Sequence, residues 1–205
     1  MDKMLFWVSV FTIFLDVFAQ TDLDKKVFVF PRESSSDHVN LITKLETPLL
    51  FSYNTPGKDN ELLIYKEKLG EYSLYIGGTK VTARVPEEIL APVHICTSWE
   101  SSSGIAEFWI NGKPLVKKGL KRGYSVAAHP KIILGQEQDS YGGKFDRGQS
   151  FLGEIGDVYM WDSVLSPDDV QAVYYGSYVN GSILNWQALN YELNDYVIIK
   201  PRVWD

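Results

Sequence analysis

Residues 93–116 read VHICTSWESSSGIAEFWINGKPLV, and this stretch decides the class of fold. Two runs rich in β-branched and aromatic residues, 93–99 and 105–110, flank the turn Ser101-Ser102-Ser103-Gly104. Asn111-Gly112 then separates the second run from Leu115-Val116, and Asn-Gly between apolar runs is the strongest short signal for a β-hairpin. The stretch therefore predicts consecutive antiparallel strands.

Strand signals continue on both sides of this stretch. Six more runs are predicted as strands: 27–30, 61–65, 72–76, 131–134, 152–161 and 196–199. One short helix is predicted to begin at Pro167, capped by Ser166, with Asp168 and Asp169 at the positive end of its dipole, and to end near Gly176. Many strands, one helix and no internal repeat predict an all-β antiparallel sandwich or jelly roll.

Length and composition are consistent with a single domain of this kind. The chain has 205 residues, and 14% of them are aromatic, which favours strands around a large core over disorder. The formal net charge is −6, so bulk electrostatics do not attract nucleic acid or an anionic membrane. Binding of an anion would need a local site or a bound cation.

The first 19 residues resemble a secretory signal peptide. Lys3 precedes an apolar run over residues 4–15, and Ala19 provides a small residue at the expected cleavage site. The apolar run is too short to span a bilayer, and no later segment is longer. We therefore expect a signal peptide over residues 1–19, a folded domain over residues 20–205, secretion, and no membrane insertion.

The chain contains a single cysteine, Cys96. No intrachain disulfide can form, which is unusual for a secreted protein. An odd cysteine in such a protein suggests intermolecular pairing, a free thiol or a missing partner.

An acidic loop follows the strand predicted at 131–134. It reads QEQDSYGG over residues 136–143, and it holds Glu137 and Asp139 with no Lys or Arg between them. Like charges this close repel unless a cation separates them, and Ca²⁺ takes six to eight oxygen ligands on flexible loops. The alternative is a polar surface turn, because acidic turns are common.

Two other segments supply the same kind of ligand. Asp59-Asn60 immediately precedes a predicted strand, and Gln149 lies in a loop before another. Each alone is an ordinary turn. If the sandwich brings the three loops together, the side chains of Asp59, Asn60, Glu137, Asp139 and Gln149 and the carbonyl of Gln138 suffice for two neighbouring Ca²⁺ ions.

Other functional signals are weaker. The sequence lacks a G-x-S-x-G motif and a phosphate-binding glycine loop, and Glu154 and Asp157 would point to opposite faces of a strand. We therefore expect no enzymatic activity. The basic cluster at residues 117–122 is either a solvated loop or a polyanion contact. Asn180-Gly181-Ser182 is a sequon for N-glycosylation of Asn180.

The motifs together resemble those of the pentraxin family. Residues 94–101, HICTSWES, match the family signature H-x-C-x-S/T-W-x-S/T, and the segments 59–62 and 136–139 match its calcium loops. Residues 65–77 and 185–192 extend the resemblance over essentially the whole mature chain.

The resemblance implies a flattened, concanavalin-like jelly roll of two antiparallel sheets with one short helix. It implies a cyclic homopentamer that binds two Ca²⁺ ions per protomer through Asp59, Asn60, Glu137, Gln138, Asp139 and Gln149. Leu63, Tyr65 and Tyr75 would form an apolar wall beside the ligand.

The family's partners extend these expectations. Its ligands carry phosphate or carboxylate groups: phosphoethanolamine, acidic saccharides, glycosaminoglycans, DNA and chromatin, and amyloid fibrils. Complement and Fc receptors are further family partners. The implied role is that of a secreted calcium-dependent pattern-recognition lectin of innate immunity.

The chain departs from the family pattern near residues 48–51. Pentraxins of this type carry a segment between Pro48-Leu49 and Leu50-Phe51 that includes a strand, the second disulfide cysteine and a glycosylation site. Its absence here resembles an internal deletion. The alternative function is therefore an isoform defective in folding or ligand binding.

Overall fold

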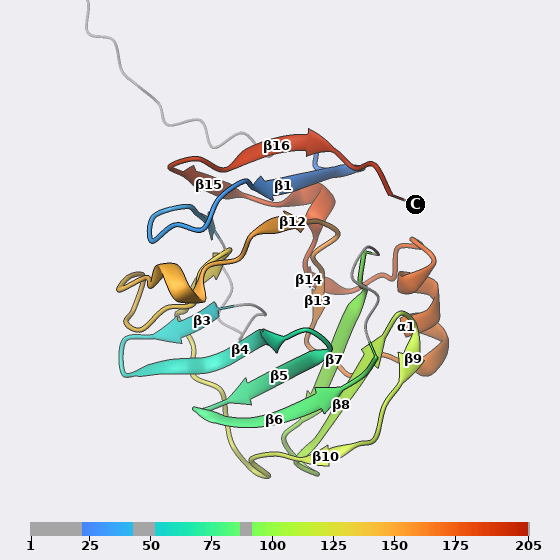
Figure 1. The fold of residues 1–205 in the computed structure, drawn as a ribbon. Coiled ribbons are helices and arrows are strands. Elements are labelled where there is room, and N and C mark those ends of the chain that lie inside the picture. Colours follow the sequence, from blue (N-terminus) through green and yellow to red (C-terminus); the bar gives the residue numbers. More distant parts are fainter. Residues whose placement is uncertain (1–21, 43–51, 87–91, 205) are drawn as a thin grey trace, which may run out of the picture.

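The computed structural model describes residues 22–42, 52–86 and 92–204 (Figure 1). The expected signal peptide at 1–19 and the expected junction at 48–51 lie outside these residues. Within the described part, we find no helix with the length and apolar character needed to cross a bilayer.

The described residues confirm an all-β fold with one short α-helix, α1 (Pro167–Tyr174). Two 3-10 helices are also present, η1 (Arg147–Gln149) and η2 (Trp186–Ala188). The strands are β1 (Lys26–Phe30), β2 (His38–Leu41), β3 (Ser52–Thr55), β4 (Lys58–Lys68), β5 (Glu71–Ile76), β6 (Thr79–Arg84), β7 (Ile95–Glu100), β8 (Ile105–Ile110), β9 (Lys113–Pro114), β10 (Lys118–Gly119), β11 (Lys131–Leu134), β12 (Gly153–Ile155), β13 (Met160–Trp161), β14 (Ser182–Leu184), β15 (Tyr191–Asn194) and β16 (Ile198–Pro201).

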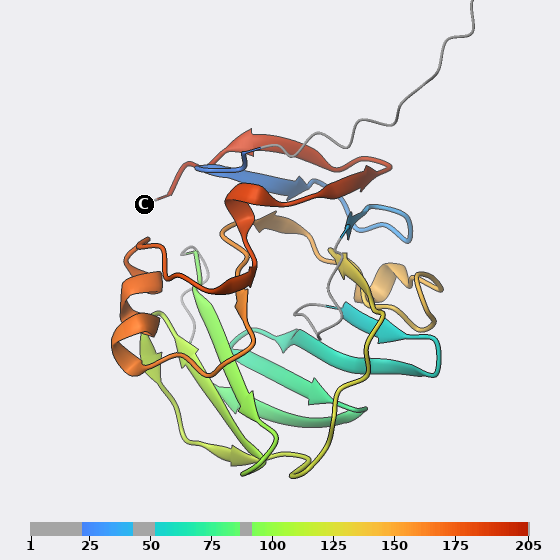
Figure 2. The same cartoon turned by 180° about the vertical axis from the view of Figure 1, so that it is seen from behind.

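These strands form two layers of antiparallel sheet. One layer is a seven-stranded sheet in the order β15-β2-β11-β3-β4-β5-β6. The smaller sheets β10-β8-β7 and β12-β1-β16 belong to the opposite layer, and β13 pairs with β14. Turning the molecule brings β7 and β8 in front of β5 and β6, so the two layers face each other (Figure 2).

The core lies between the layers because the strand residues alternate in direction. Leu62 and Leu74 are buried in the core, whereas the cross-strand pair Leu63 and Tyr75 lies on the opposite face of the seven-stranded sheet. Trp186 is fully buried against Phe28, with the two ring centroids 4.9 Å apart in an edge-to-face arrangement.

The predicted helix is confirmed, including its cap. The Ser166 hydroxyl accepts a hydrogen bond from the Asp169 amide at 3.1 Å, as an N-cap residue does. One strand prediction is corrected. The run 152–161 divides into β12 and β13, where Gly156 packs against Val27 and Asp157 has a φ of 53°. The predicted Asn111-Gly112 hairpin is confirmed: β8 pairs with Lys113–Pro114, and the Leu115 amide donates to the Phe108 carbonyl at 2.8 Å.

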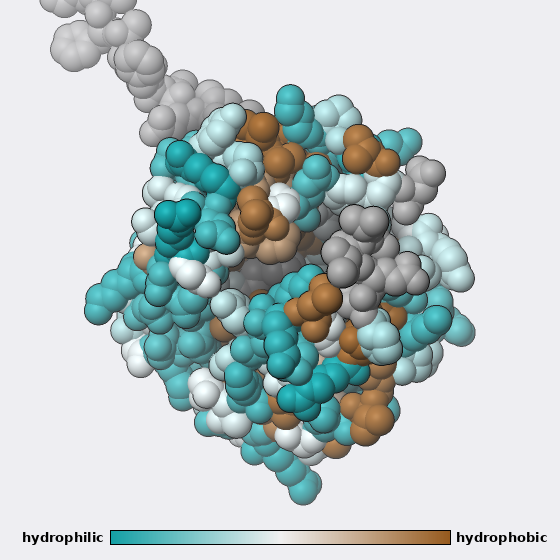
Figure 3. Space-filling view, viewed as in Figure 1, coloured by the Kyte–Doolittle hydropathy of each residue, from teal (hydrophilic) through white to brown (hydrophobic). Residues whose placement is uncertain are grey.

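The layer that contains β7 is interrupted. Among the residues that the structure describes, the order β10-β8-β7 ends at β7 and the order β12-β1-β16 ends at β12. Figure 3 shows hydrophobic patches of the described residues among a mostly hydrophilic surface in this view. Within the described residues β7 is therefore an edge strand, and edge strands present N–H and C=O groups that another chain can pair with.

Candidate metal centre

The acidic loop begins where β11 ends, and Gly135 makes this turn possible. Its φ is 87°, and a Cβ there would come within 2.1 Å of the Phe30 ring, so only glycine fits. The Gly135 carbonyl accepts a hydrogen bond from the Phe151 amide at 2.9 Å. This bond closes residues 136–150 into one loop, which contains four of the six expected calcium ligands.

The other two ligands lie at the start of β4. The pairing of β3 with β4 shifts register between Tyr53 and Thr55, as at a β-bulge or a similar irregularity. Asn60 has a φ of 50°, a left-handed conformation that Asn tolerates better than most residues. Such an irregularity changes the direction in which side chains point. Asn60 therefore does not share the core-facing direction of Leu62, although the two residues are two positions apart.

Several oxygen atoms at these loops are buried and have no hydrogen-bond donor within the described part of the chain. They are Asn60 Oδ1, Gln136 Oε1, both carboxylate oxygens of Glu137, and Gln149 Oε1, and all except Gln136 Oε1 belong to predicted ligands. A buried acceptor without a partner is costly, and most such groups in proteins are satisfied. Four of these unsatisfied acceptors stand at predicted ligand positions, where a bound cation would satisfy them.

The charges of the site agree with this interpretation. Burial, followed by the negative charges of Asp139 and Asp59, raises the pKa of Glu137 from its ordinary value to about 7. Glu137 is 4% exposed, whereas Asp59 and Asp139 are exposed. We therefore assign the loops a negative potential that a hard cation would neutralise.

The donor set fits calcium better than zinc. In the described ranges, no three His, Cys, Asp or Glu side chains are placed to hold a metal ion by themselves, so a cation here would also need amide and carbonyl oxygens. The available donors are instead carboxylate, amide and carbonyl oxygens, the set that Ca²⁺ prefers. If the ion binds, the predicted residues Asp59, Asn60, Glu137, Gln138, Asp139 and Gln149 would hold it, and their assignment stays a prediction.

Two glutamines that flank Glu137 fix the loop, and only one of them is an expected ligand. The side-chain amide of Gln136 donates to the carbonyls of Ser34 at 2.5 Å and Asp37 at 3.3 Å. The side-chain amide of Gln138 donates to the Ser52 carbonyl at 2.5 Å. Both glutamines are buried, so they anchor the loop on opposite sides of Glu137.

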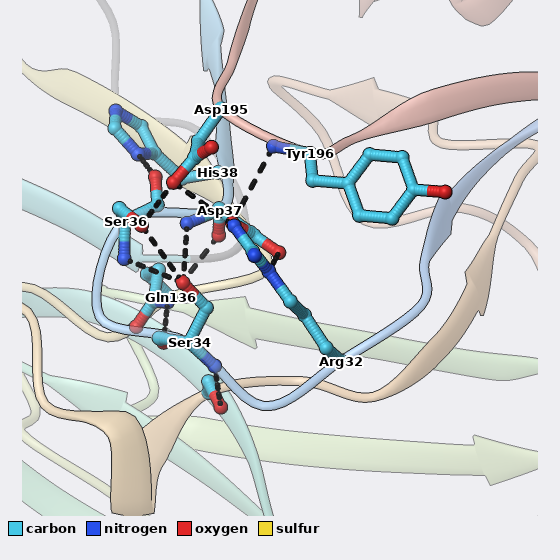
Figure 4. Close-up of polar contacts among 9 residues, drawn as sticks. Arg32, Ser34, Ser36, Asp37, His38, Gln136, Asp195 and Tyr196 are labelled. Carbon is cyan, nitrogen blue, oxygen red and sulfur yellow. Dashed lines mark hydrogen bonds and ion pairs between the residues drawn. The ribbon is translucent and has the colours of Figure 1, made fainter.

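The β1–β2 loop accepts the hydrogen bonds from Gln136, and it is itself held by further hydrogen bonds and ion pairs (Figure 4). Arg32 donates twice to the Asp37 carboxylate at 2.9 Å, which lowers the pKa of Asp37, and Arg32 also contacts Asp195 at 3.1 Å. No local pattern in the sequence predicts this support, because its residues lie about 100 positions from Gln136. Nothing local in residues 32–37 indicates a relation to the acidic loop.

The three residues of the expected apolar wall share one face of the sheet, but only two of them are accessible. Leu63 and Tyr75 are cross-strand partners, and Tyr65 lies two residues further along the same face of β4. Burial raises the pKa of Tyr65, with smaller contributions from Glu67 and Glu137, so its ring lies near the acidic loop. Leu63 is only 4% exposed, which leaves the two tyrosines as the accessible part of this wall.

The remaining signals lie elsewhere on the surface. Asn180 is exposed in the turn before β14, as an acceptor for glycosylation must be. In the basic cluster at 117–122, Lys117 pairs with Glu107 and Lys121 lies over the Tyr124 ring, so two of its charges have local partners.

Comparisons with known proteins give a consistent result. A sequence model of the Pentaxin family matches residues 49–201. Serum amyloid P-component of Cavia porcellus is 92% identical over 223 positions, and that of Homo sapiens is 65% identical over 222, with 100% of both chains covered in each comparison. A heptameric SAP-like pentraxin from Limulus polyphemus superposes with a TM-score of 0.78 at 22% identity, covering 89% of this chain and 98% of that one.

The first of these alignments is longer than the chain. It spans 223 positions against 205 residues, so 18 positions have no residue of this chain. Eight per cent of 223 is also about 18, and the unmatched positions therefore account for the whole difference. The family match begins at residue 49, next to the junction where the missing segment is expected.

Proposed function

The chain belongs to the pentraxin family, and we propose that it is a secreted calcium-dependent lectin that recognises phosphate- or carboxylate-bearing ligands. The family relationship makes it a pattern-recognition protein in the broad sense. The calcium site, the ligands and the role in innate immunity are the parts that we propose.

One observation carries the proposal: the unpartnered buried oxygens of Asn60, Glu137 and Gln149. They come from three segments of the chain and lie at positions where the sequence predicts ligands. The raised pKa of Glu137 supports the same interpretation, because an unneutralised carboxylate in a buried position resists ionisation.

The ligand would bind beside this site. A bound Ca²⁺ supplies open coordination positions for phosphate or carboxylate oxygens. The rings of Tyr65 and Tyr75, which share a face of β4 and β5, would contact the apolar part of a ligand such as phosphoethanolamine. Acidic saccharides, glycosaminoglycans, chromatin and amyloid fibrils present the same anionic groups in arrays.

Arrayed ligands favour an oligomer with its sites on one face. We propose a homopentamer. Once one of its sites is bound, the other sites are held at a high effective concentration near the array, so several weak contacts together give tight binding. A monomeric variant would then lose retention on arrayed ligands while it kept the affinity for soluble phosphoethanolamine. Engagement of complement and Fc receptors belongs to the same proposal.

The test is retention on phosphoethanolamine-agarose, measured with calcium and with excess EDTA. We expect retention in calcium and elution by EDTA. Glu137→Gln should weaken retention, and Glu192→Gln, a change at an exposed carboxylate of β15, should not. Equal retention of the parent chain in EDTA would contradict a calcium-dependent mechanism.

A second function is supported by the interrupted layer. The 18 unmatched positions and the single neighbour of β7 among the described strands favour an isoform that folds or assembles poorly. Expression in secretory cells separates the two proposals: a lectin reaches the medium as an oligomer, and a defective isoform is retained in the cell.

A further inference from the structure

Asn54 contacts both loops that the calcium proposal requires. It lies in β3, its side chain is fully buried, and no sequence motif singles it out. Its side-chain nitrogen Nδ2 donates to the carbonyl oxygen of Gln138 at 2.5 Å. Its side-chain oxygen Oδ1 accepts from the backbone amide of Asn60 at 2.9 Å. One buried amide therefore joins two loops that are far apart in the sequence.

The bond to Gln138 orients an expected ligand. A carbonyl oxygen has two lone pairs, so a bond from Asn54 leaves the second free for a cation. The same residue is held from the other side, because the Gln138 amide donates to the Ser52 hydroxyl at 2.9 Å. Asn54 and Ser52 together fix the Gln138 peptide against β3.

The bond to Asn60 secures a conformation that the backbone does not favour. Asn60 has a left-handed φ of 50°, and its side-chain oxygen is buried without a hydrogen-bond partner in the described residues. Left-handed residues persist where their surroundings over-determine them. Asn54 supplies one such restraint, because its side-chain oxygen accepts the hydrogen bond from the backbone amide of Asn60.

We propose that Asn54 is a positioning residue for calcium, which sets the Asn60 and Gln138 oxygens at a fixed separation without itself contacting the ion. The inference rests on the proposed function, since it assigns Asn54 a role in that site. Residues that orient metal ligands typically change metal affinity by about 10–100-fold when they are mutated.

A purely structural role would have a different signature. Loss of a buried hydrogen bond lowers stability wherever it occurs, whereas loss of a positioning residue also lowers calcium affinity. Tyr53→Phe is the matched control. Tyr53 is fully buried in the same strand, and its hydroxyl donates to the Ala127 carbonyl, which belongs to neither loop.

The experiment compares the full chain with Asn54→Leu, Asn54→Ser and Tyr53→Phe. Leucine keeps the volume of the side chain and removes both bonds, and serine is a smaller polar substitute that cannot span the two loops. Calcium affinity is measured by isothermal titration, and stability by thermal unfolding in EDTA. We expect both Asn54 variants to bind calcium at least about ten-fold more weakly, and Tyr53→Phe to lose stability with unchanged affinity.

Hydrogen exchange in EDTA provides a readout that does not need calcium. We expect faster exchange at residues 59–60 and 137–139 in the Asn54 variants and unchanged exchange there in Tyr53→Phe. If Asn54→Leu does not fold, Asn54→Ser carries the test. Calcium affinity equal to that of the parent in a folded Asn54 variant overturns the role of Asn54 alone. Absence of calcium binding by the folded parent overturns the proposed function and this inference with it.

Discussion

Cys96 in β7 lies directly opposite Trp109 in β8, and the Trp109 side chain is only 8% exposed. Burial raises the pKa of the Cys96 thiol to about 11. Since the thiolate is the reactive form, little of it is present at neutral pH. The free thiol expected from the sequence is therefore less reactive in the folded chain than its lack of a disulfide partner suggests.

We predict slow alkylation of Cys96 in the native state. Iodoacetamide at neutral pH should label the folded chain far more slowly than the same chain in guanidinium chloride, as measured by intact mass. Trp109→Ala should speed the native reaction, because it removes cover from the opposite strand. Native labelling as fast as that of the unfolded chain would contradict the burial of this thiol.

Glu137→Gln should change stability and calcium response in opposite directions. The substitution removes a negative charge that burial and the neighbouring carboxylates disfavour, so the chain without calcium should become more stable. We expect the melting temperature in EDTA to rise by a few degrees and the calcium-induced rise to shrink. Differential scanning fluorimetry with and without calcium measures both, and Glu192→Gln should change neither.

Stability without calcium should depend on pH through Glu137. Its pKa is about 7 in the folded chain against an ordinary value of 4.5, so the folded state holds the proton more tightly than the unfolded state. The resulting stabilisation is complete below pH 4.5 and is lost as the pH rises through about 7. Urea unfolding in EDTA at pH 6 and pH 8 checks this, and Glu137→Gln should reduce the difference.

Calcium binding should follow the opposite trend, because protons compete with the ion for Glu137. We predict that calcium affinity weakens as the pH falls below about 7. Isothermal titration at pH 6 and pH 8 measures the change. An affinity that is equal at both pH values would mean that Glu137 is not a ligand.

Asn180 should carry an N-linked glycan when the chain is made in secretory cells. The residue is exposed in a turn, and its sequon partner Ser182 begins β14. Treatment with peptide N-glycosidase F should lower the mass of the parent. Asn180→Gln and Ser182→Ala should both migrate like the treated protein, and a parent that does not shift would show the site to be unused.

The interrupted layer should lower stability and favour association. A family disulfide of the kind absent here typically contributes about 2–5 kcal/mol. We expect a lower melting temperature than that of an intact pentraxin, concentration-dependent association through the β7 edge, and partial recovery by calcium. Sedimentation velocity over a range of concentrations tests the association, and a discrete pentamer as stable as an intact relative would contradict it.

The sequence predicted the parts of this fold that depend on neighbouring residues. The cap at Ser166 and the strand at 131–134 follow from local patterns, and both are confirmed. The break near Gly156 was missed, because it depends on contact with Val27, which lies far away in the chain. Four-residue strands such as β3 carry too few residues for a periodic pattern.

In the candidate site too, features that depend on neighbouring residues could be predicted and features that depend on distant contacts could not. Glu137 and Asp139 are conspicuous in the sequence because two carboxylates lie in one short loop without a cation. Asn54 is not, because an uncharged buried amide has no distinguishing local context, and the anchoring role of Gln136 is equally invisible in its own loop. The Gln138 partner of Asn54 is 84 residues away and the Asp37 partner of Gln136 about 100, so only the folded chain shows what they hold.

This separation along the chain has a kinetic consequence. The bond between Asn54 and Gln138 joins residues 84 positions apart, and β3 pairs directly with β11. Contacts this distant form late, after much of the chain has collapsed. Calcium would therefore leave the refolding rate of the chain nearly unchanged and slow its unfolding, because it would stabilise the folded chain and not the transition state for folding.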